Sequence, residues 1–407
     1  MPSAESVRTV PDLVDPATHA EQDLGAVWRG LRAQDPVHWH PETAAGPGFW
    51  VVSRYADVLR ALRDDAGFCS RGGNVLETLL AGGDMGADRM LPVSDGPRHA
   101  ALRRVLLEAF SPRALAGVAE HVRAVTARLV RDGIERGGCD FAADIASQIP
   151  LETICGLLDV PEADRPELLM LTKSALASDY ADPEAGVDRR ARSAIMIYFH
   201  ELVEARRRNP GTDPISLMAA ARIDGQPIGD EDIVLNCYSL IIGGDETSRL
   251  SMIGAAHALA AHPEQWAALK SGAVSVESAT EEVLRWSSPT THIGRTATAP
   301  VSWHGSEIAA GDRVTLWTCS ANRDEAVFAD PDTFDLARTP NKHLAFGHGR
   351  HYCLGAYLGR VEIGALLEAL RAQVGGIEQT APERRIYSNF LSGMSSLPVA
   401  LSPDPRG

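Results

Sequence analysis

The stretch Phe346-Gly347-His348-Gly349-Arg350-His351-Tyr352-Cys353-Leu354-Gly355 is the most informative part of this chain. It places Cys353 between a glycine-rich loop and the segment 354–372, whose apolar spacing predicts a helix. The unpaired N–H groups and the positive dipole end of a helix N-terminus favour the thiolate form of a nearby cysteine. Glycines at three loop positions would let the backbone approach a bulky, flat group. The residues alone leave open whether this cysteine serves redox chemistry or binds a metal.

The composition is that of a globular protein that can bury a sizeable core, because 44% of its 407 residues are hydrophobic and 23% are charged. The net charge of −15 argues against a nucleic-acid partner. We find no apolar run of about 18 residues and no signal peptide, and therefore expect a cytoplasmic protein without a membrane association. The six cysteines are scattered, without a CxxC pair, which fits neither a disulfide framework nor a zinc site.

Helical spacing predominates in most of the chain, and the segments 47–54 and 299–317 carry the signature of short strands. Residues 1–20 are expected to be irregular. The glycine-rich segment 71–94 is expected to form a long loop, and 177–188 a connection between helices. The expected helices are 54–64, 98–110, 113–135, 140–157, 189–208, 231–261, 275–287 and 354–372.

A second constellation, Gly243-Gly244-Asp245-Glu246-Thr247-Ser248, lies inside the expected helix 231–261. Each glycine in a helix interior costs about 1 kcal/mol relative to alanine, so a close approach to another group is the expected compensation. The residues alone favour a simple helix–helix crossing as that close approach. A second possibility is a site in which the Thr247 hydroxyl acts beside the Glu246 carboxylate.

These motifs closely resemble those of the cytochrome P450 family, and the resemblance runs from about residue 30 to the end. The order and spacing are similar to those of soluble bacterial members of the actinobacterial secondary-metabolism type. The resemblance implies a mainly α fold with small β-sheets, a triangular helical prism whose long central helix lies over haem. It also implies that 21–407 form a single catalytic domain after the irregular segment 1–20.

The resemblance implies haem b as cofactor, with the Cys353 thiolate as axial ligand of the iron. Thr247 and Glu246 would be catalytic, Thr247 by hydrogen-bonding dioxygen and Glu246 by relaying protons. A charged set would lock the core around the haem loop, formed by Glu282, Arg285 and Arg338. The remaining cofactor-binding residues would be the propionate donors His99, Arg103, Arg295 and His351, with Phe346, Gly347, Gly349, Gly355, Gly243 and Gly244.

The function implied is that of a monooxygenase, an oxidoreductase that inserts one atom of O2 into a small molecule by hydroxylation or epoxidation. We expect a secondary-metabolite biosynthetic intermediate as substrate. Because the chain shows no flavin or nicotinamide domain, electrons from NAD(P)H would arrive through a separate ferredoxin and ferredoxin reductase.

Three alternatives remain. Gly-Gly-x-Glu-Thr-x-Arg, which includes Arg249, is similar to relatives that oxidise a carrier-protein-bound amino acid or peptide. A peroxide-driven haem enzyme and a non-enzymatic haem-thiolate sensor are the others, and the presence of Glu246 beside Thr247 argues against both.

The substrate pocket is expected to mix apolar and polar residues, which suits a mid-sized, partly polar substrate. The segments expected to line it are 74–93, 170–190, Leu240 to Thr247, Thr290 to Ile293 and Leu391 to Ser395. A basic patch on the cysteine side is expected to receive the electron donor, formed by Arg103, Arg104, Arg350 and Arg360.

Overall fold

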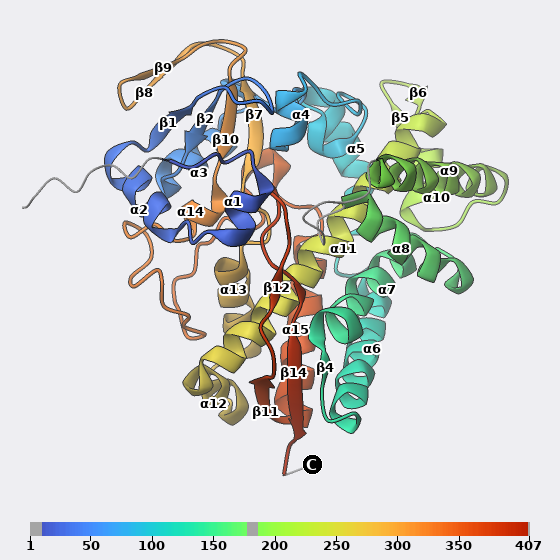
Figure 1. The fold of residues 1–407 in the computed structure, drawn as a ribbon. Coiled ribbons are helices and arrows are strands. Elements are labelled where there is room, and N and C mark those ends of the chain that lie inside the picture. The colour runs from blue at the N-terminus through green and yellow to red at the C-terminus, as the bar shows by residue number, and fades with distance from the viewer. Residues whose placement is uncertain (1–9, 177–185, 406–407) are drawn as a thin grey trace, which may run out of the picture.

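Helix α11, Asp230–Ala261, crosses the centre of the molecule, and the other elements pack around it (Figure 1). The computed structural model describes residues 10–176 and 186–405. With 32 residues, α11 is about 48 Å long at 1.5 Å per residue. Its first turn carries Asp230, Glu231 and Asp232, whose charges complement the positive end of the helix dipole. The expected helix over 231–261 is confirmed.

The rest of the described chain is mainly helical with small sheets, which confirms the expected fold class. Helical boundaries agree with the expected ones to within about three residues at most positions. The helices of seven or more residues around α11 are α2 (Gly25–Gln34), α3 (Tyr55–Arg63), α5 (Gly96–Ala109), α6 (Ala116–Glu135), α7 (Gln148–Leu157), α8 (Arg165–Leu176), α9 (Val187–Arg208), α10 (Pro214–Ala220), α12 (Pro263–Ser271), α13 (Val276–Ser287) and α15 (Ala356–Gln373).

Two hydrophobic clusters hold α11 in place. The larger joins its second half, from Leu250 to Leu259, to α6, α13 and α15. The other joins its first half, from Ile233 to Ile241, to α5, α7, α8, α9 and α10. Each fully buried leucine or isoleucine contributes about 1.5–3 kcal/mol. Residues 243–248 lie between the two clusters and belong to neither, so the middle of the helix is available for a site.

A five-stranded sheet lies beside α2 and α3, at the upper left of Figure 1. Its order is β1-β2-β10-β7-β3, and only the β2–β10 pair is parallel. A three-stranded sheet, β11-β14-β4, packs against α6 and α11. The strands are β1 (Val37–His40), β2 (Phe49–Val52), β3 (Phe68–Cys69), β4 (Cys139–Asp140), β7 (Ile293–Ala297), β10 (Arg313–Leu316), β11 (Val374–Gln379) and β14 (Pro398–Pro403), and the hairpin β8–β9 spans Val301–Trp303 and Ser306–Ile308.

The N-terminal segment is more ordered than expected, since α1 (Pro16–Glu21) begins within the range 1–20. Asp15 caps this helix by accepting the backbone N–H of Ala17 at 2.9 Å, and Pro16 occupies the first helical position. Leu13 is fully buried ahead of it. The expectation of an irregular segment up to residue 20 is therefore wrong for its last part.

Two other expectations need correction. The loop expected over 71–94 contains the short helix α4 (Leu76–Leu80) and a 3₁₀ turn at Leu91–Val93. The helix expected over 140–157 is a π-helical turn at Ala142–Ala146 followed by α7. Of the connection expected over 177–188, residues 177–185 lie outside the described residues.

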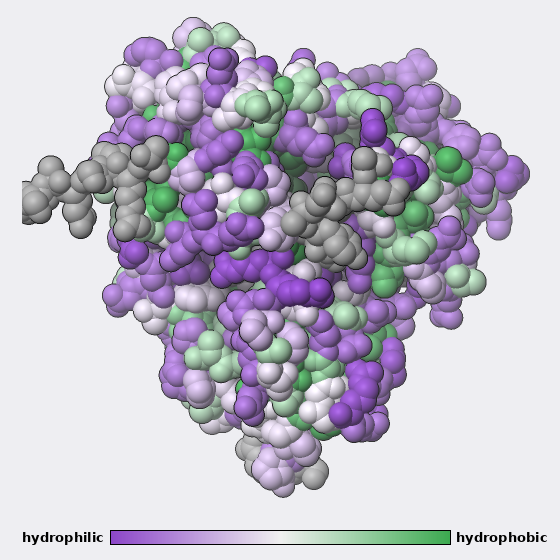
Figure 2. Space-filling view, in the orientation of Figure 1, coloured by the Kyte–Doolittle hydropathy of each residue, from purple (hydrophilic) through white to green (hydrophobic). Residues whose placement is uncertain are grey.

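The face shown in Figure 2 is mainly hydrophilic, with small separate hydrophobic areas. This fits a chain whose apolar residues are gathered in the clusters around α11. None of the helices in the described part of the chain is both long and apolar enough to cross a membrane.

Candidate active site around Cys353

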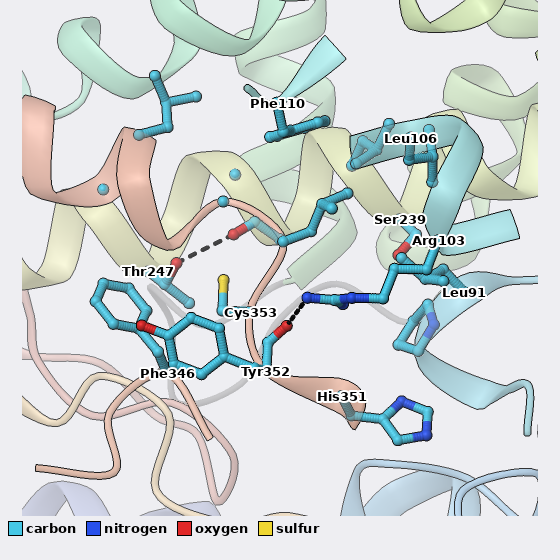
Figure 3. Close-up of a pocket in the computed structure, with 18 of the residues that line it drawn as sticks. Leu91, Arg103, Leu106, Phe110, Ser239, Thr247, Phe346, His351, Tyr352 and Cys353 are labelled. Carbon is cyan, nitrogen blue, oxygen red and sulfur yellow. Dashed lines mark hydrogen bonds between the residues drawn. The ribbon is translucent and has the colours of Figure 1, made fainter. Parts of the chain in front are cut away.

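A cavity lies between the middle of α11 and the loop that precedes α15 (Figure 3). One part has a volume of about 290 Å³, and an adjoining part has a volume of about 260 Å³. Both parts are lined by Thr247 of α11 and by His351 and Cys353 of the loop, although these two segments are far apart in the chain. Figure 3 shows the Cys353 sulfur and the Thr247 hydroxyl pointing into this space.

Cys353 lies deep in the protein, and the surface that it exposes belongs to the cavity. Its backbone N–H donates to the carbonyl of Phe346 at 2.9 Å, which closes the loop. Gly347 and Gly349 have φ of 66° and 73°, in the left-handed region, which explains the two glycines. A side chain at Gly349 would also collide with the backbone carbonyl of Leu62.

The polypeptide by itself does not stabilise the thiolate form of Cys353 that the expected helix N-terminus predicts. Helix α15 begins at Ala356, later than the expected Leu354. Burial raises the pKa of the Cys353 thiol, and the Gly355 N–H and the Arg103 charge lower it by less. A metal ion deprotonates a coordinating thiol outright, so ligation of iron would supply the missing stabilisation of the thiolate.

Four cationic or hydrogen-bonding side chains gather at one side of the cavity: His99, Arg103, Arg295 and His351. Arg103 donates to the carbonyl of Tyr352 at 2.6 Å, and the His99 and His351 rings lie 4.2 Å apart between centroids. Burial, with the neighbouring His351 and Arg103 charges, lowers the pKa of His99 to about 4. Burial also lowers the pKa of Arg295 to about 10.

One carboxylate, Asp95, stands beside this group, and its Oδ1 lies 3.4 Å from Nε2 of His351. Burial alone would raise the pKa of Asp95, but the His351 hydrogen bond and the backbone N–H groups of Ser70 and Arg71 bring it down to about 2. Asp95 is therefore an anion already held by several donors. It cannot satisfy all four side chains.

The residues present fit haem. Nε2 of His99 is buried and has no hydrogen-bond partner among the described residues, so it lacks an acceptor that a propionate would provide. Arg103 and Arg295 suit carboxylates through charge-assisted hydrogen bonds. A Cβ built on Gly243 would meet no atom within 4 Å, and one on Gly355 only the Cys353 sulfur at 3.9 Å, so both glycines border open space. The cavity thus offers a thiol, anion-binding donors and room for a flat ring.

The adjacent glycines of α11 have different neighbours. A Cβ on Gly244 would lie 3.2 Å from the side chain of Ile154 on α7, so this glycine permits close helix packing. Both glycines border the larger part of the cavity, but only Gly243 has open space at its Cβ position and borders the second part as well. Thr247 donates its hydroxyl to the carbonyl of Gly243 at 3.1 Å, one turn earlier. A helix crossing and a site therefore both occur here, at neighbouring residues.

Glu246 borders the second part of the cavity, and its carboxylate pairs with Arg249. Arg249 Nε donates to Oε2 at 2.9 Å, and Nη2 donates to Oε1. Both residues are about 2% exposed. The proton relay expected of Glu246 stays a prediction, and the three-residue spacing of Glu246 and Arg249 on one helix is the local signal of this ion pair.

The charged set around Glu282 lies together as the resemblance implied. Arg285 donates two hydrogen bonds of 2.7 Å to the Glu282 carboxylate, and Arg338 Nε donates at 3.2 Å. Glu282 and Arg285 are fully buried. The Arg285 guanidinium also donates to the carbonyls of Asn322, Pro331 and Thr333, so the set holds α13 to the segment 322–338.

The pocket lining was partly predicted. The expected segments contribute Asn74, Leu91 and Pro92, the face from Leu240 to Thr247, Thr290, His292, Ile293 and Leu391. No described residue of 170–190 borders either part of the cavity, and 177–185 lie outside the description. Ser239 and Glu362 also border the cavity, and both lie outside the segments expected to line it. Glu362 carries a signal in hindsight, because it is an acid on the apolar face of α15.

The basic patch expected on the cysteine side is wrong in most of its members. Arg360 forms a bidentate pair with Glu281 at 2.6 and 3.0 Å, and Arg350 pairs with Asp65. Arg103 turns inward to the cavity. Of the four, only Arg104 is an exposed residue for which the described part of the chain shows no ion pair.

Comparison with known proteins agrees with this geometry. A family model described as Cytochrome P450 matches residues 275–370. Cytochrome P450 NovI from Streptomyces niveus is 48% identical over 391 residues, which cover 96% of each chain. Linalool 8-monooxygenase from Pseudomonas putida is 34% identical over 97% of this chain and 99% of its own. The crystal structure of P450 OxyD, involved in the biosynthesis of vancomycin-type antibiotics, superposes with a TM-score of 0.90 at 34% identity, over 97% of this chain and 100% of OxyD.

The chain belongs to the cytochrome P450 family. It is accordingly a monooxygenase, an oxidoreductase that binds haem through a cysteine thiolate and uses O2 with electrons derived from NAD(P)H. When bound, haem supplies the activation of dioxygen, to which the thiolate contributes electron density.

Proposed function

We propose that this monooxygenase hydroxylates or epoxidises a small-molecule intermediate of secondary-metabolite biosynthesis. A separate ferredoxin and ferredoxin reductase would deliver its electrons. The observation that carries the proposal is that Thr247 and Cys353 face one cavity from opposite segments of the chain, beside a group of donors suited to propionates. The similarity to OxyD, whose role lies in antibiotic biosynthesis, supports the class of pathway.

The chain's own residues would perform three tasks. Apolar side chains such as Leu240, Ile293 and Leu391 exclude water from the cavity, which strengthens the electrostatic interactions inside it. His99, Arg103, Arg295 and His351 would hold the propionates and fix the orientation of the ring. The Thr247 hydroxyl, now on the carbonyl of Gly243, would turn to donate to dioxygen and hold a proton at that atom.

The substrate would be mainly apolar with a few polar groups. Asn74 and Ser239 border the larger part of the cavity, and no hydrogen bond of either side chain to a described residue is seen. Their amide and hydroxyl would therefore bind polar atoms of the substrate. An amino acid or peptide on a carrier protein remains the second candidate, but Arg249 of that motif is buried behind Glu246 and does not border the cavity.

The test begins with ligand binding to the haem-loaded protein. Low-to-high-spin shifts would be measured with terpenoids, macrolide intermediates, free amino acids and the same amino acids loaded on a carrier protein. Reconstitution with ferredoxin, reductase and NADPH would then compare product with NADPH consumed. A shift and a product with free terpenoid or polyketide ligands support the main proposal, and a response restricted to carrier-bound amino acids supports the second candidate.

Thr247→Ala tests the proposed role of the Thr247 hydroxyl in oxygen activation, and Thr247→Ser is the matched control. We expect NADPH consumption to continue in Thr247→Ala while product per NADPH falls severalfold, because the hydroxyl that holds the proton is lost. Thr247→Ser should stay close to the wild type. Unchanged coupling in Thr247→Ala would show that this hydroxyl has no part in oxygen activation.

A further inference from the structure

The short helix α4 lies beside the cavity, and its own sequence does not complete its first turn. The residue before the helix, Val75, has no side-chain oxygen that could accept a free N–H group of that turn. Leu76, the first residue of the helix, is fully buried, so its N–H has no contact with bulk solvent. A buried N–H of this kind needs an acceptor from elsewhere in the chain.

That acceptor is His292, which immediately precedes β7 and is 216 positions away in the sequence. Its Nε2 accepts the N–H of Leu76 at 3.0 Å. His292 is fully buried, and its ring packs against Trp317 and Phe390, with centroids 4.9 and 5.6 Å away. A distant histidine, held by aromatic packing, thus replaces the cap that Val75 cannot provide.

The hydrogen bonds on the other side of the ring fix its protonation. Nδ1 of His292 lies 3.1 Å from the hydroxyl oxygen of Thr291. That hydroxyl has a single hydrogen, which it donates to the carbonyls of Asn389 and Phe390 at 2.9 and 3.0 Å. It therefore accepts from Nδ1–H, which leaves Nε2 without a proton and able to accept. Burial, with the nearby His19, lowers the pKa of His292 to about 3, which agrees with a neutral ring.

The segment around α4 is held at two further points. Gly294 on β7 donates its N–H to the carbonyl of Asn74 at 2.8 Å, and Arg313 on β10 donates to the carbonyl of Leu79 at 2.8 Å. A Cβ on Gly294 would lie 2.6 Å from the Leu79 side chain and 3.0 Å from the backbone of Asn74. Helix α4 therefore lies directly against β7, as Figure 1 shows.

Asn74 is the residue of this segment that borders both parts of the cavity. It lies two residues before Leu76, so its backbone is held by Gly294 and the chain directly after it is held by His292. Movement of the first turn of α4 would therefore displace the Asn74 amide, the group to which the proposed function assigns contact with polar atoms of the substrate.

We propose that His292 is a positioning residue for substrate selectivity, which caps α4 from a distant segment and thereby fixes Asn74 in the cavity wall. The proposal rests on the proposed function only in that a small molecule must occupy the cavity. The ring acts through the backbone of Leu76 and need not touch that molecule. A fixed wall rejects ligands whose bulk does not match it, whereas a wall without the cap can shift to admit them.

Three substitutions separate the cap from the packing of the ring. His292→Phe keeps an aromatic ring and removes both nitrogens. His292→Asn keeps a polar group near the position of Nδ1 but is too short to reach Leu76, and His292→Gln places an amide oxygen near the position of Nε2. His40→Phe is the matched control. Nε2 of the buried His40 also accepts a backbone N–H, that of Leu13 at 3.1 Å, but His40 lies outside the cavity lining.

The first measurement is hydrogen–deuterium exchange of the haem-loaded protein without ligand. We expect exchange at residues 74–80 to become about tenfold faster in His292→Phe and His292→Asn, and to stay near the wild-type rate in His292→Gln and His40→Phe. Wild-type exchange in both His292→Phe and His292→Asn would show that this hydrogen bond does not hold the helix. Equal acceleration in His292→Gln would show that the ring packing matters and the acceptor does not. Either result would overturn the proposal. The Asn and Gln variants decide the question even if His292→Phe does not fold.

The second measurement uses imidazole, 4-phenylimidazole and 4-(biphenyl-4-yl)imidazole, which bind the haem iron and extend to different distances into the cavity. Absorbance titrations give their dissociation constants. Imidazole should bind equally to all the variants and the wild type. The dissociation constant of the biphenyl compound relative to that of imidazole should fall about fivefold in His292→Phe and His292→Asn, and should not change in His292→Gln or His40→Phe. A ratio that is unchanged or raised in His292→Phe and His292→Asn would refute the role in selectivity.

Neither measurement needs the substrate or a product. The proposed function can therefore fail for lack of a product while the loss of the cap is still detected, and a product formed by the wild type leaves the role of His292 to be decided by the variants. The carbon monoxide spectrum of each variant confirms that its haem site is intact.

Discussion

Glu246 and Arg249 form a two-point ion pair across one turn of α11, and both side chains are almost completely buried. The acid that the sequence suggests as a proton relay is thus held by a guanidinium inside the protein. A buried pair of this kind is expensive to break, because removal of one partner leaves the other charged and without compensation.

Arg249→Met should therefore destabilise the protein by about 3–5 kcal/mol. The double variant Glu246→Leu/Arg249→Met should lose less, because no unpaired charge remains. Chemical unfolding of the haem-loaded proteins measures both. Arg123→Met is the control, since it removes a half-exposed arginine whose distance to Glu368 is 3.7 Å, and it should cost at most about 1 kcal/mol. A double variant less stable than Arg249→Met would contradict this account.

In Cys353→Ser, the reduced carbon monoxide complex should lose the Soret band at the position that is characteristic of thiolate-ligated haem. A serine hydroxyl does not replace the thiolate as ligand of the iron. The measurement is the carbon monoxide difference spectrum after reduction. Cys139→Ser, on β4 and outside the cavity lining, should keep the band. Persistence of the band in Cys353→Ser would overturn the assignment of the ligand.

His99→Phe should separate haem binding from the stability of the polypeptide. The loss of a hydrogen bond to a charged propionate should weaken haem binding roughly ten- to a hundredfold, which corresponds to about 1.5–3 kcal/mol. The haem-free protein should be as stable as the wild type or more so, since a buried nitrogen without a partner is removed. Haem titration and unfolding of the apoprotein give the two values. His121→Phe, on the exposed side of α6, should change neither.

Asp245→Asn should gain stability relative to the wild type as the pH rises. The pKa of Asp245 is about 7 in the folded protein and 3.8 in the unfolded reference, so folding favours the protonated form. Protonated Asp245 makes its full contribution to the free energy of unfolding below pH 4. This contribution is lost as the pH rises to about 7, by up to about 1.4 kcal/mol per pH unit. Asparagine cannot ionise and avoids the loss.

Unfolding of Asp245→Asn and the wild type at pH 5 and pH 8 would measure the effect. Asp132→Asn, at a half-exposed position on α6, supplies the comparison. If the difference between Asp245→Asn and the wild type were the same at both pH values, Asp245 would be ionised throughout.

The haem site could be predicted largely from the sequence because its residues occur in short motifs with fixed spacing. Cys353 with its glycines, and Thr247 beside Glu246, signal their chemistry locally. The prediction of the propionate donors depended on the resemblance to the family, because His99 and Arg103 by themselves could equally lie in solvent. What the structure adds is the single cavity that they share.

Partners that lie far apart in the chain could not be predicted in the same way. The sequence shows Arg350 and Arg360 as free cations, but Asp65 and Glu281 neutralise them after folding. Glu362 stands out in the sequence only as an acid on the apolar face of its helix, and its almost complete burial appears only in the folded protein. The helix α1 was missed for a different reason, because its signal, Asp15 followed by Pro16, is local but short.

The unequal neighbours of Gly243 and Gly244 suggest how this enzyme could be retuned in the laboratory. A methyl group at 243 would project into open space, whereas one at 244 would press on Ile154. A library aimed at new substrates should therefore vary position 243 and leave 244 alone. Selectivity can then be changed at one residue without loosening the helical frame beside it.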